Sequence, residues 1–325
     1  MMSRRKKGGS HDLKPKQVVR RNPRISRLAV FVALFTSPAL AQTSLGIPGV
    51  LAPGVAPELV QGGFTSIEGP VGAADGTVYF SDRMPDRTYH LGLDGKITVY
   101  QENTGAANGL AFTRDGDMVR AEGGAKRIGK VTRDGKVSVL TDSYNGKPLV
   151  SPNDLIVDAK GGIYFTDPGP RPIMPGRPTN VYYLPAGAKE PILIDDQNPR
   201  PNGLTLTLDG RTLLVDNTIG PVVFAFDVQS DGTVKNRRPF LQLQDIPADK
   251  ESVADGMAID REGRLYVTSV VGIQVFDPAG KYLGRLRGAR NLAFGGPDKR
   301  TLYLTAADGF FRVKMLSQGP ERLGK

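Results

Sequence analysis

One pattern of polar and apolar positions recurs six times along this chain of 325 residues. Each copy has a polar residue, a short apolar run, a turn seven positions after the polar residue, and then a run rich in β-branched and aromatic residues. The polar residues are Glu68, Asn108, Asn153, Asn202, Asp255 and Asn291. The turns fall at Asp75, Asp115, Lys160, Asp209, Glu262 and Asp298. A constant offset in six copies indicates a common register, so the copies are structural repeats.

The runs that follow the turns predict short strands at 77–81, 117–121, 163–166, 212–215, 264–268 and 301–305. Further alternating runs, such as 272–276 and 282–287, are separated by turns of the hairpin type. Four short antiparallel strands in every 40 to 50 residues are typical of a propeller blade. The sequence therefore predicts an all-β fold, a six-bladed β-propeller of four-stranded antiparallel blades.

The sixth unit lacks one strand, because the chain ends soon after its third strand at 310–314. Residues 58–65, which precede the first repeat, supply the expected outer strand of that sheet. Such an N-terminal strand closes the ring and removes an exposed edge. We therefore expect one propeller domain over 58–325, preceded by an N-terminal linker at 42–57.

The formal net charge of +10 is concentrated at the N-terminus. Residues 1–41 hold ten Lys or Arg and one acidic residue, which leaves 33 basic and 32 acidic residues in the remainder. A nearly neutral body offers no basic face for a phosphate backbone, so we expect no nucleic-acid partner. We expect the folded chain to be a monomer.

The basic N-terminal segment leads into an apolar run at 28–35, then Pro38 and the small residues Ala39 and Ala41. This order is typical of a secretory signal peptide, predicted at 1–41 and cleaved before Gln42. An uncleaved anchor is the alternative, but the apolar run is shorter than the roughly 20 residues that span a bilayer. The prediction is a periplasmic or secreted protein without stable membrane association. Whether the signal is of the Sec or twin-arginine type stays open.

The chain contains no cysteine and only two histidines. It therefore cannot form a disulfide, a Cys/His catalytic pair or a Cys/His zinc cage. A Ser/His/Asp triad is also unsupported, because no nucleophile elbow is present and His90 is the one histidine after the signal. Any metal ion must be held by oxygen atoms.

The inner strands of a propeller run in the same sense along the central tunnel, so the six polar residues should meet at one rim. Two carboxylates and up to four amide oxygens suit Ca²⁺, with Mg²⁺, Mn²⁺ or Zn²⁺ as other possible ions. We predict that the ligands are Glu68, Asn153, Asn202 and Asp255. For a single Asn-Gly pair the alternative is a hairpin turn. For Asn108 and Asn291, capping of the strand start is favoured.

The same residues resemble the motifs of the SMP-30/gluconolactonase/LRE family, over about residues 64–314. The matching motifs are Glu68-Gly69-Pro70, Pro152-Asn153-Asp154, Pro201-Asn202-Gly203-Leu204 and Asp255-Gly256-Met257. The resemblance implies one catalytic calcium ion at the tunnel mouth, held by the four predicted ligands. The segment 163–168 is similar to a stretch of bacterial gluconolactonases.

The chain departs from the sugar-lactonase members at Ser151, where those proteins place an Arg that contacts substrate. The segment 168–178, with Arg171 and Arg177, is expected either to bring cations over the mouth or to be an exposed loop. We take Arg171, Asn108 and Asp167 as candidate contacts to a small-molecule substrate. Glu122 and Asp216 end second strands near the rim, where they are candidates for lining a pocket.

The predicted function is that of a secreted, calcium-dependent hydrolase of lactones. The ion polarises the carbonyl, and Asp255 is the candidate catalytic base that takes a proton from the attacking water. One alternative is phosphotriester hydrolysis, since the family also resembles diisopropylfluorophosphatase. The other is a non-catalytic binding propeller of the NHL type with a structural calcium ion. The sequence does not determine the substrate, the physiological metal or the oligomeric state.

Overall fold

The strands pair with their neighbours in the sequence, and almost every pair forms part of a four-stranded sheet. The computed structural model describes residues 46–172, 176–177 and 179–322. These residues form 26 strands, and none of them lies in a helix. Besides the six large sheets there is a small hairpin made of β10 (Ser143–Tyr144) and β11 (Lys147–Pro148).

In each of the first five blades, four consecutive strands pair antiparallel in chain order. Blades 1 and 2 consist of β2 (Ile67–Gly72), β3 (Val78–Asp82), β4 (Arg87–Leu91), β5 (Ile97–Glu102), β6 (Ala107–Phe112), β7 (Met118–Glu122), β8 (Arg127–Val131) and β9 (Val137–Thr141). Blades 3 and 4 consist of β12 (Leu155–Val157), β13 (Ile163–Asp167), β14 (Asn180–Leu184), β15 (Ile192–Asp195), β16 (Pro201–Leu206), β17 (Thr212–Asn217), β18 (Val222–Val228) and β19 (Val234–Gln242). Blade 5 consists of β20 (Met257–Ile259), β21 (Leu265–Ser269), β22 (Gly272–Phe276) and β23 (Tyr282–Leu286).

The sixth blade is built from both ends of the chain. It contains β24 (Asn291–Gly295), β25 (Thr301–Ala306), β26 (Gly309–Lys314) and, as its outer strand, β1 (Glu58–Gln61). Strand β1 pairs antiparallel with β26, and Glu58 forms an ion pair of 2.8 Å with the facing Arg312. The predicted closure by an N-terminal strand is therefore confirmed.

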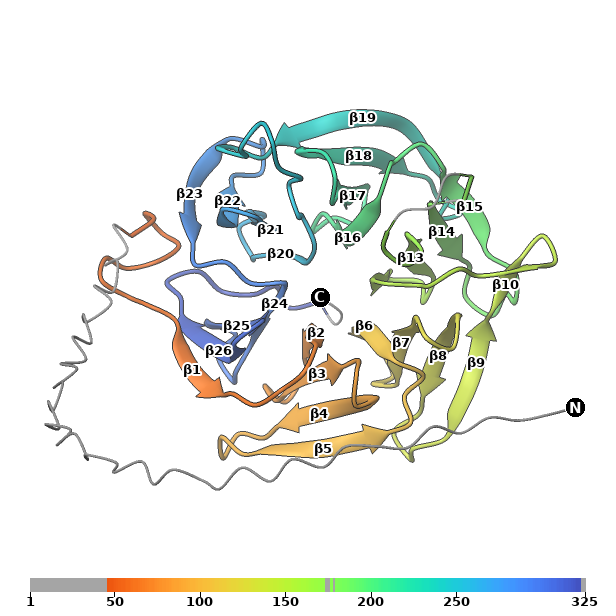
Figure 1. Cartoon of the computed structure of the whole chain (residues 1–325), viewed down its shortest axis with the longest axis horizontal. Helices are drawn as coiled ribbons and strands as arrows, with labels where there is room; N and C mark the ends of the chain where they lie inside the picture. Colours follow the sequence, from red (N-terminus) through yellow and green to blue (C-terminus); the bar gives the residue numbers. More distant parts are fainter. Residues whose placement is uncertain (1–45, 173–175, 178, 323–325) are drawn as a thin grey trace, which may run out of the picture. The chain divides into compact units, whose positions relative to one another are not determined.

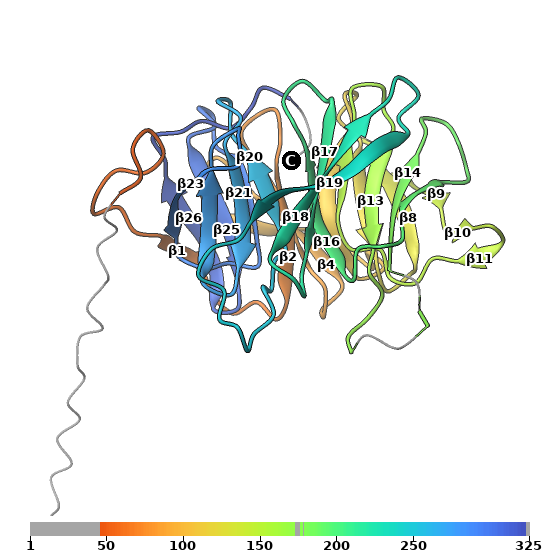
Figure 2. The same ribbon diagram turned by 90° about the horizontal axis from the view of Figure 1, so that it is seen from above.

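The six sheets surround a central axis, and the first strand of each lies innermost (Figure 1). The inner strands β2, β6, β12, β16, β20 and β24 contact one another in that order, and β24 contacts β2 again. The predicted six-bladed propeller is therefore confirmed. In Figure 2 the blades are seen edge-on, with connecting loops on two opposite faces.

The hydrophobic core is divided into six clusters, one at each interface between neighbouring blades. Between blades 6 and 1, for example, the rings of Phe80 and Phe310 stack at 4.2 Å between centroids. Because the two faces of each blade are covered by the two neighbouring blades, the middle strands are buried on both sides. This explains why their sequences are continuous apolar runs rather than strict alternations.

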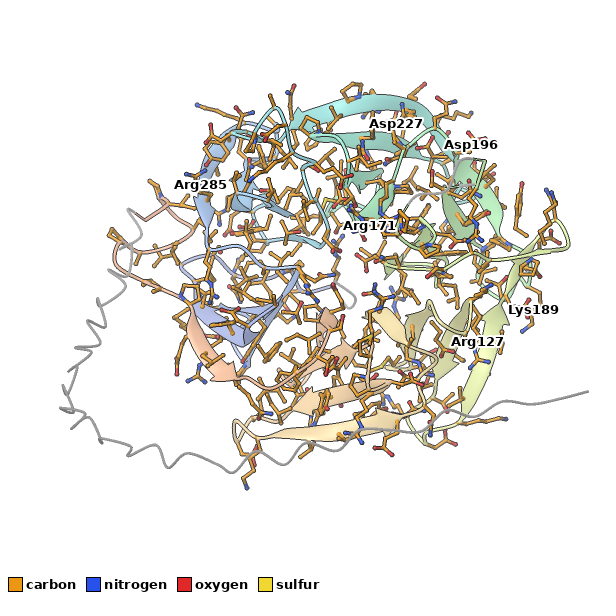
Figure 3. The ribbon with its side chains drawn as sticks, viewed as in Figure 1. Arg127, Arg171, Lys189, Asp196, Asp227 and Arg285 are labelled. Carbon is orange, nitrogen blue, oxygen red and sulfur yellow. The ribbon has the colours of Figure 1, made fainter. Side chains whose placement is uncertain are left out.

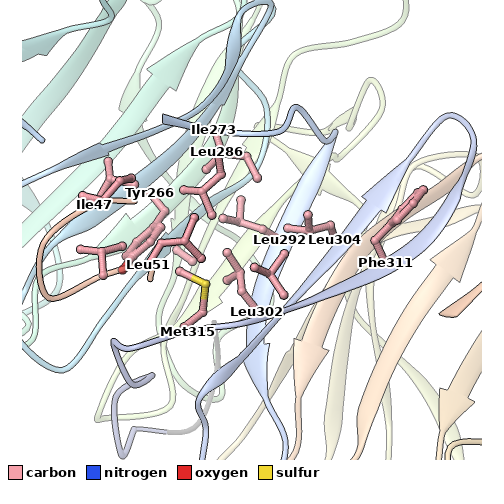
Figure 4. Packing of buried hydrophobic residues seen from close by; sticks show 14 of the residues in the cluster. Ile47, Leu51, Tyr266, Ile273, Leu286, Leu292, Leu302, Leu304, Phe311 and Met315 are labelled. Carbon is pink, nitrogen blue, oxygen red and sulfur yellow. The ribbon is translucent and has the colours of Figure 1, made fainter. Parts of the chain in front are cut away.

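Residues 46–55 pack against the propeller, although they lie in the segment that we expected to be a linker. Ile47 and Leu51 are buried in the cluster between blades 5 and 6 (Figure 4), and Val50 belongs to the same cluster. The backbone NH of Leu316 donates to the carbonyl oxygen of Val50 at 2.9 Å. The predicted signal peptide, 1–41, lies outside the described residues. Within the described part of the chain, no helix is long and apolar enough to cross a membrane.

Candidate active site at one rim of the tunnel

The six polar residues of the repeat all lie where an inner strand begins. Glu68, Asn108 and Asn202 are the second residues of β2, β6 and β16, and Asn291 opens β24. Asn153 and Asp255 precede β12 and β20 by two residues. Asn108 and Asn202 thus lie inside strands, not in hairpin turns. Because the inner strands are neighbours around the ring, these positions meet at one rim.

Hydrogen bonds join these positions from every blade to the next. They are Ser81 Oγ to Asn108 O (2.7 Å), Gly109 N to Asn153 O (2.8 Å), Thr166 Oγ1 to Asn202 O (2.7 Å), Asn202 Nδ2 to Ala254 O (3.4 Å), Gly256 N to Arg290 O (2.9 Å) and Arg290 Nη1 to Ser66 Oγ (3.4 Å). The last bond runs from blade 6 back to blade 1. At this rim the six blades are therefore joined in a closed ring, and Asn153 and Asn202 are bonded directly to a neighbouring blade.

The glycine that follows four of the polar residues permits this close approach. A Cβ atom on Gly203 would lie 1.8 Å from the carbonyl oxygen of Asp255, and one on Gly69 would lie 2.0 Å from that of Asn108. Gly109 and Gly256 face the next blade at similarly short range. The Gly of the repeat thus allows backbone contact between blades, a role that glycine fills because it lacks a side chain.

The four predicted metal ligands differ in their exposure. Glu68 and Asn202 are 6% and 5% exposed, whereas Asn153 and Asp255 are partly exposed. The amide nitrogen of Asn202 donates to the Ala254 carbonyl, while its Oδ1 is buried and has no hydrogen-bond donor among the described residues. A buried amide oxygen without a donor costs about 1–3 kcal/mol. A cation at this position would remove that cost.

The donor set fits a hard cation. It contains two carboxylates and two amide oxygens, which are the ligand types that calcium prefers. In the described part of the chain, no group of three or more His, Cys, Asp or Glu side chains could hold a metal. The amide oxygens of Asn153 and Asn202 are the side-chain ligands that would join Glu68 and Asp255 in such a site.

The two remaining rim amides differ from each other. Asn291 Oδ1 accepts a hydrogen bond from the NH of Leu292 at 2.9 Å, so it caps the start of β24. Asn108 is also buried, but its Oδ1 has no donor within the described chain. Asn108 thus presents a second unsatisfied amide oxygen next to the predicted ligands, and its contact with substrate stays a prediction.

Asp167, a candidate for substrate contact, is engaged by the protein itself. Its carboxylate is 1% exposed and accepts hydrogen bonds from the NH groups of Val150 (2.8 Å) and Ser151 (2.6 Å). Burial raises the pKa of the Asp167 carboxyl, and the two amide donors oppose that rise. These surroundings favour a role in holding the chain over direct contact with substrate.

Arg171 lies near the inner part of the ring, whereas Arg127 and Lys189 lie further out (Figure 3). Its guanidinium forms an ion pair of 2.8 Å with Glu251, which joins the loop after β13 to the loop before β20. These two loops project from the same face of the propeller (Figure 2). The positively charged side chain of Arg171 therefore lies among the loops of that face, and its contact with substrate stays a prediction.

Arg200 is a second cation near the rim, and sequence reasoning missed it. It is 6% exposed, and its Nη1 donates to the carbonyl oxygens of Pro168 and Gly169, each at 3.3 Å. Burial and then the charge of Arg171 lower the pKa of Arg200, while Asp255 acts in the opposite direction. The sequence did contain a signal for Arg200. It lies two residues before Asn202, which is the same offset that Ser151 has from Asn153, where the sugar-lactonase members have a substrate-contacting Arg.

Glu122 and Asp216 do not line an open pocket, contrary to expectation, because both are fully buried. Glu122 accepts hydrogen bonds from Arg120 Nε (3.0 Å) and Arg127 Nε (2.5 Å) in an ion cluster. Asp216 Oδ1 accepts the NH of Gly203 at 3.1 Å. Polar residues at the ends of second strands are here enclosed between blades.

Residues 67–308 match the family model described as the SMP-30/Gluconolactonase/LRE-like region. The chain belongs to this family. A gluconolactonase of Zymomonas mobilis is 30% identical over 78% of this chain and 79% of its own length. Regucalcin of Gallus gallus is 33% identical over 40% of this chain and 44% of its own length.

Solved structures of family members share the fold. A gluconolactonase from Xanthomonas campestris has a TM-score of 0.72 at 30% identity, covering 81% of this chain and 90% of its own. A putative gluconolactonase has a TM-score of 0.74 at 26% identity, covering 85% and 97%. The matched region of the family model, residues 67–308, covers most of the propeller.

Proposed function

We propose that the protein is a calcium-dependent hydrolase of lactones. The observation that carries the proposal is the meeting of Glu68, Asn153, Asn202 and Asp255 at one rim, with the Asn202 amide oxygen buried and without a donor in the described chain. The relatives named gluconolactonase support the substrate class.

When bound, a calcium ion would polarise the lactone carbonyl and stabilise the negative charge that develops on its oxygen. Glu68 and Asp255 would supply two negative charges toward that ion, and Asn153 and Asn202 would supply neutral oxygens. Asp255 is the more accessible of the two carboxylates. It is therefore the group placed to take a proton from a water molecule that attacks the carbonyl carbon.

The N-terminal segment supports a location outside the cytoplasm. Residues 1–41 have the basic, apolar and small-residue regions of a signal peptide. We propose that the protein acts as a periplasmic or secreted monomer on a small lactone. Detection of the mature N-terminus at Gln42 by mass spectrometry of the exported protein would test this assignment.

The enzymatic proposal is tested by hydrolysis of glucono-δ-lactone and a panel of smaller lactones, with calcium and with chelator. We expect turnover with calcium, loss with chelator, and restoration when calcium is returned. Asp255→Asn should lower kcat/KM by at least about 100-fold, in the range of general-base removal. Asp231→Asn, in the exposed hairpin between β18 and β19, is the matched control and should retain activity.

The alternatives predict different results. Turnover of phosphotriesters but not lactones would assign the site to P=O substrates. No turnover of either class, with chelation changing only the melting temperature, would refute the hydrolase and favour a binding propeller with a structural ion.

A further inference from the structure

Two buried aspartates hold the backbone just before two of the predicted calcium ligands. Asp82 and Asp167 are the last residues of β3 and β13, each fourteen positions after a ligand candidate, Glu68 and Asn153. Both carboxylates are 1% exposed. The two residues therefore occupy equivalent places in blades 1 and 3.

The hydrogen bonds of the two aspartates are also equivalent. Asp82 accepts the NH of Thr65 on Oδ2 (3.0 Å) and the NH of Ser66 on Oδ1 (2.7 Å). In blade 3 the corresponding bonds to Asp167 are those of Val150 on Oδ2 (2.8 Å) and Ser151 on Oδ1 (2.6 Å). In both blades the donors are the residues three and two positions before the ligand.

The segments that donate these bonds lie outside the strands, so their NH groups are not part of a sheet ladder. A carboxylate that accepts two adjacent backbone NH groups fixes the direction in which the chain enters the inner strand. The direction of entry sets the place of the side chain two residues later. A buried charge is costly unless it is well hydrogen-bonded. The two NH donors offset that cost for each aspartate and at the same time fix the backbone before the ligand.

The corresponding positions in the other blades do not repeat the device. The last residues of the second strands there are Glu122, Asn217, Ser269 and Ala306. In blade 4 the residue fourteen positions after Asn202 is the buried Asp216, but it accepts the NH of Gly203, which follows the ligand candidate (3.1 Å). Glu122 instead binds two arginines. The segments before Asn202 and Asp255 are held by neutral groups, since Asn198 Oδ1 accepts the NH of Arg200 (3.2 Å) and Ser252 Oγ accepts that of Ala254 (3.2 Å).

We propose that Asp82 and Asp167 are positioning residues that hold Glu68 and Asn153 in place for calcium binding. This inference rests on the proposed function, because it assumes that these residues bind the ion. The two carboxylates act through the backbone and also add negative charge near the rim. Supporting groups of this kind typically change metal affinity by about 10–100-fold when they are altered.

The test is calorimetric titration of calcium into the chelator-treated full-length protein and its Asp82→Asn and Asp167→Asn variants. We expect each variant to bind calcium about 10–100-fold more weakly at a temperature where it is fully folded. Asp260→Asn is the matched control. Asp260 is equally buried and accepts backbone NH groups from Glu262 (3.1 Å) and Arg264 (2.9 Å), but it lies beyond the opposite end of β20.

The control variant should lose thermal stability and keep the calcium affinity of the wild type. If the wild type binds calcium while Asp82→Asn and Asp167→Asn bind within twofold of it, the positioning role is wrong. Equal loss of affinity in Asp260→Asn would also refute it, because a general loss of stability would then explain the effect. If the wild type itself binds no calcium, the proposed calcium-dependent function is wrong, and the positioning role is refuted with it.

Hydrogen exchange of the unaltered protein provides a readout that does not depend on any variant folding. The amides of Thr65, Ser66, Val150 and Ser151 should be protected in the absence of calcium, because their acceptors are already in place. Exchange of these amides at the rate of open loops in the calcium-free protein would show that the aspartates do not hold the chain.

Discussion

Truncation of Leu51 to alanine tests whether residues 46–55 belong to the folded propeller. Leu51 is buried beside Ile47 and Val50 in the cluster between blades 5 and 6. Removing a buried leucine side chain costs about 2–5 kcal/mol, because transfer free energy is lost and a cavity is left. We expect the free energy of unfolding to fall by about 3 kcal/mol, and the melting temperature by roughly 6–12 °C.

The measurement is urea unfolding followed by circular dichroism, with calorimetry for the melting temperature. The chain has no tryptophan, so indole fluorescence is not available. Leu93→Ala is the control, because Leu93 is 63% exposed between β4 and β5. Its effect should stay within about 0.5 kcal/mol. A loss below 1 kcal/mol for Leu51→Ala would refute the packing and favour the expected linker at 42–57.

Three further predictions follow from buried contacts. Glu122→Gln should lower the free energy of unfolding by about 3–5 kcal/mol in urea denaturation, since it leaves the buried Arg120 and the half-buried Arg127 without their carboxylate. As a control, Glu102→Gln should cost less than about 1 kcal/mol, because the ion pair of Glu102 is exposed. Gly203→Ala should prevent folding or, in the folded protein, abolish the calcium binding measured by calorimetry, because the added Cβ would overlap the Asp255 carbonyl. A folded variant with wild-type affinity would contradict this. Arg322→Ala should lower the melting temperature in calorimetry and leave kcat/KM unchanged, because Arg322 donates to the carbonyl of Leu206 (2.7 Å) at the rim opposite the site; an unchanged melting temperature would contradict it.

The fold was predictable because the repeat is governed by local chemistry. The seven positions between the polar residue and the turn span the inner strand, so the offset recurs in all six blades. The missing strand of blade 6 could likewise be inferred, because an unpaired edge is unfavourable and residues 58–65 were unassigned.

Contacts made across space could not be predicted in the same way. Residues 46–55 contain several Gly and Pro, which are typical of a linker, and only packing shows Ile47 and Leu51 to be buried. The close approach of the repeat glycines to the next blade could not be predicted either, because it depends on how neighbouring blades pack. Glu122 is similar: its position at a strand end says nothing about the arginines that enclose it.

The composition of the rim explains why amides take part in the proposed site. Two carboxylates balance the charge of one calcium ion, so a buried complex with Glu68 and Asp255 carries little net charge and is inexpensive to bury. Carboxylates in place of Asn153 and Asn202 would bind the ion more tightly but would offset the field that acts on the substrate oxygen. Neutral amide oxygens supply coordination without that loss. The exposure of Asp255 then leaves one of the two charges accessible to water, which is where a proton acceptor is needed.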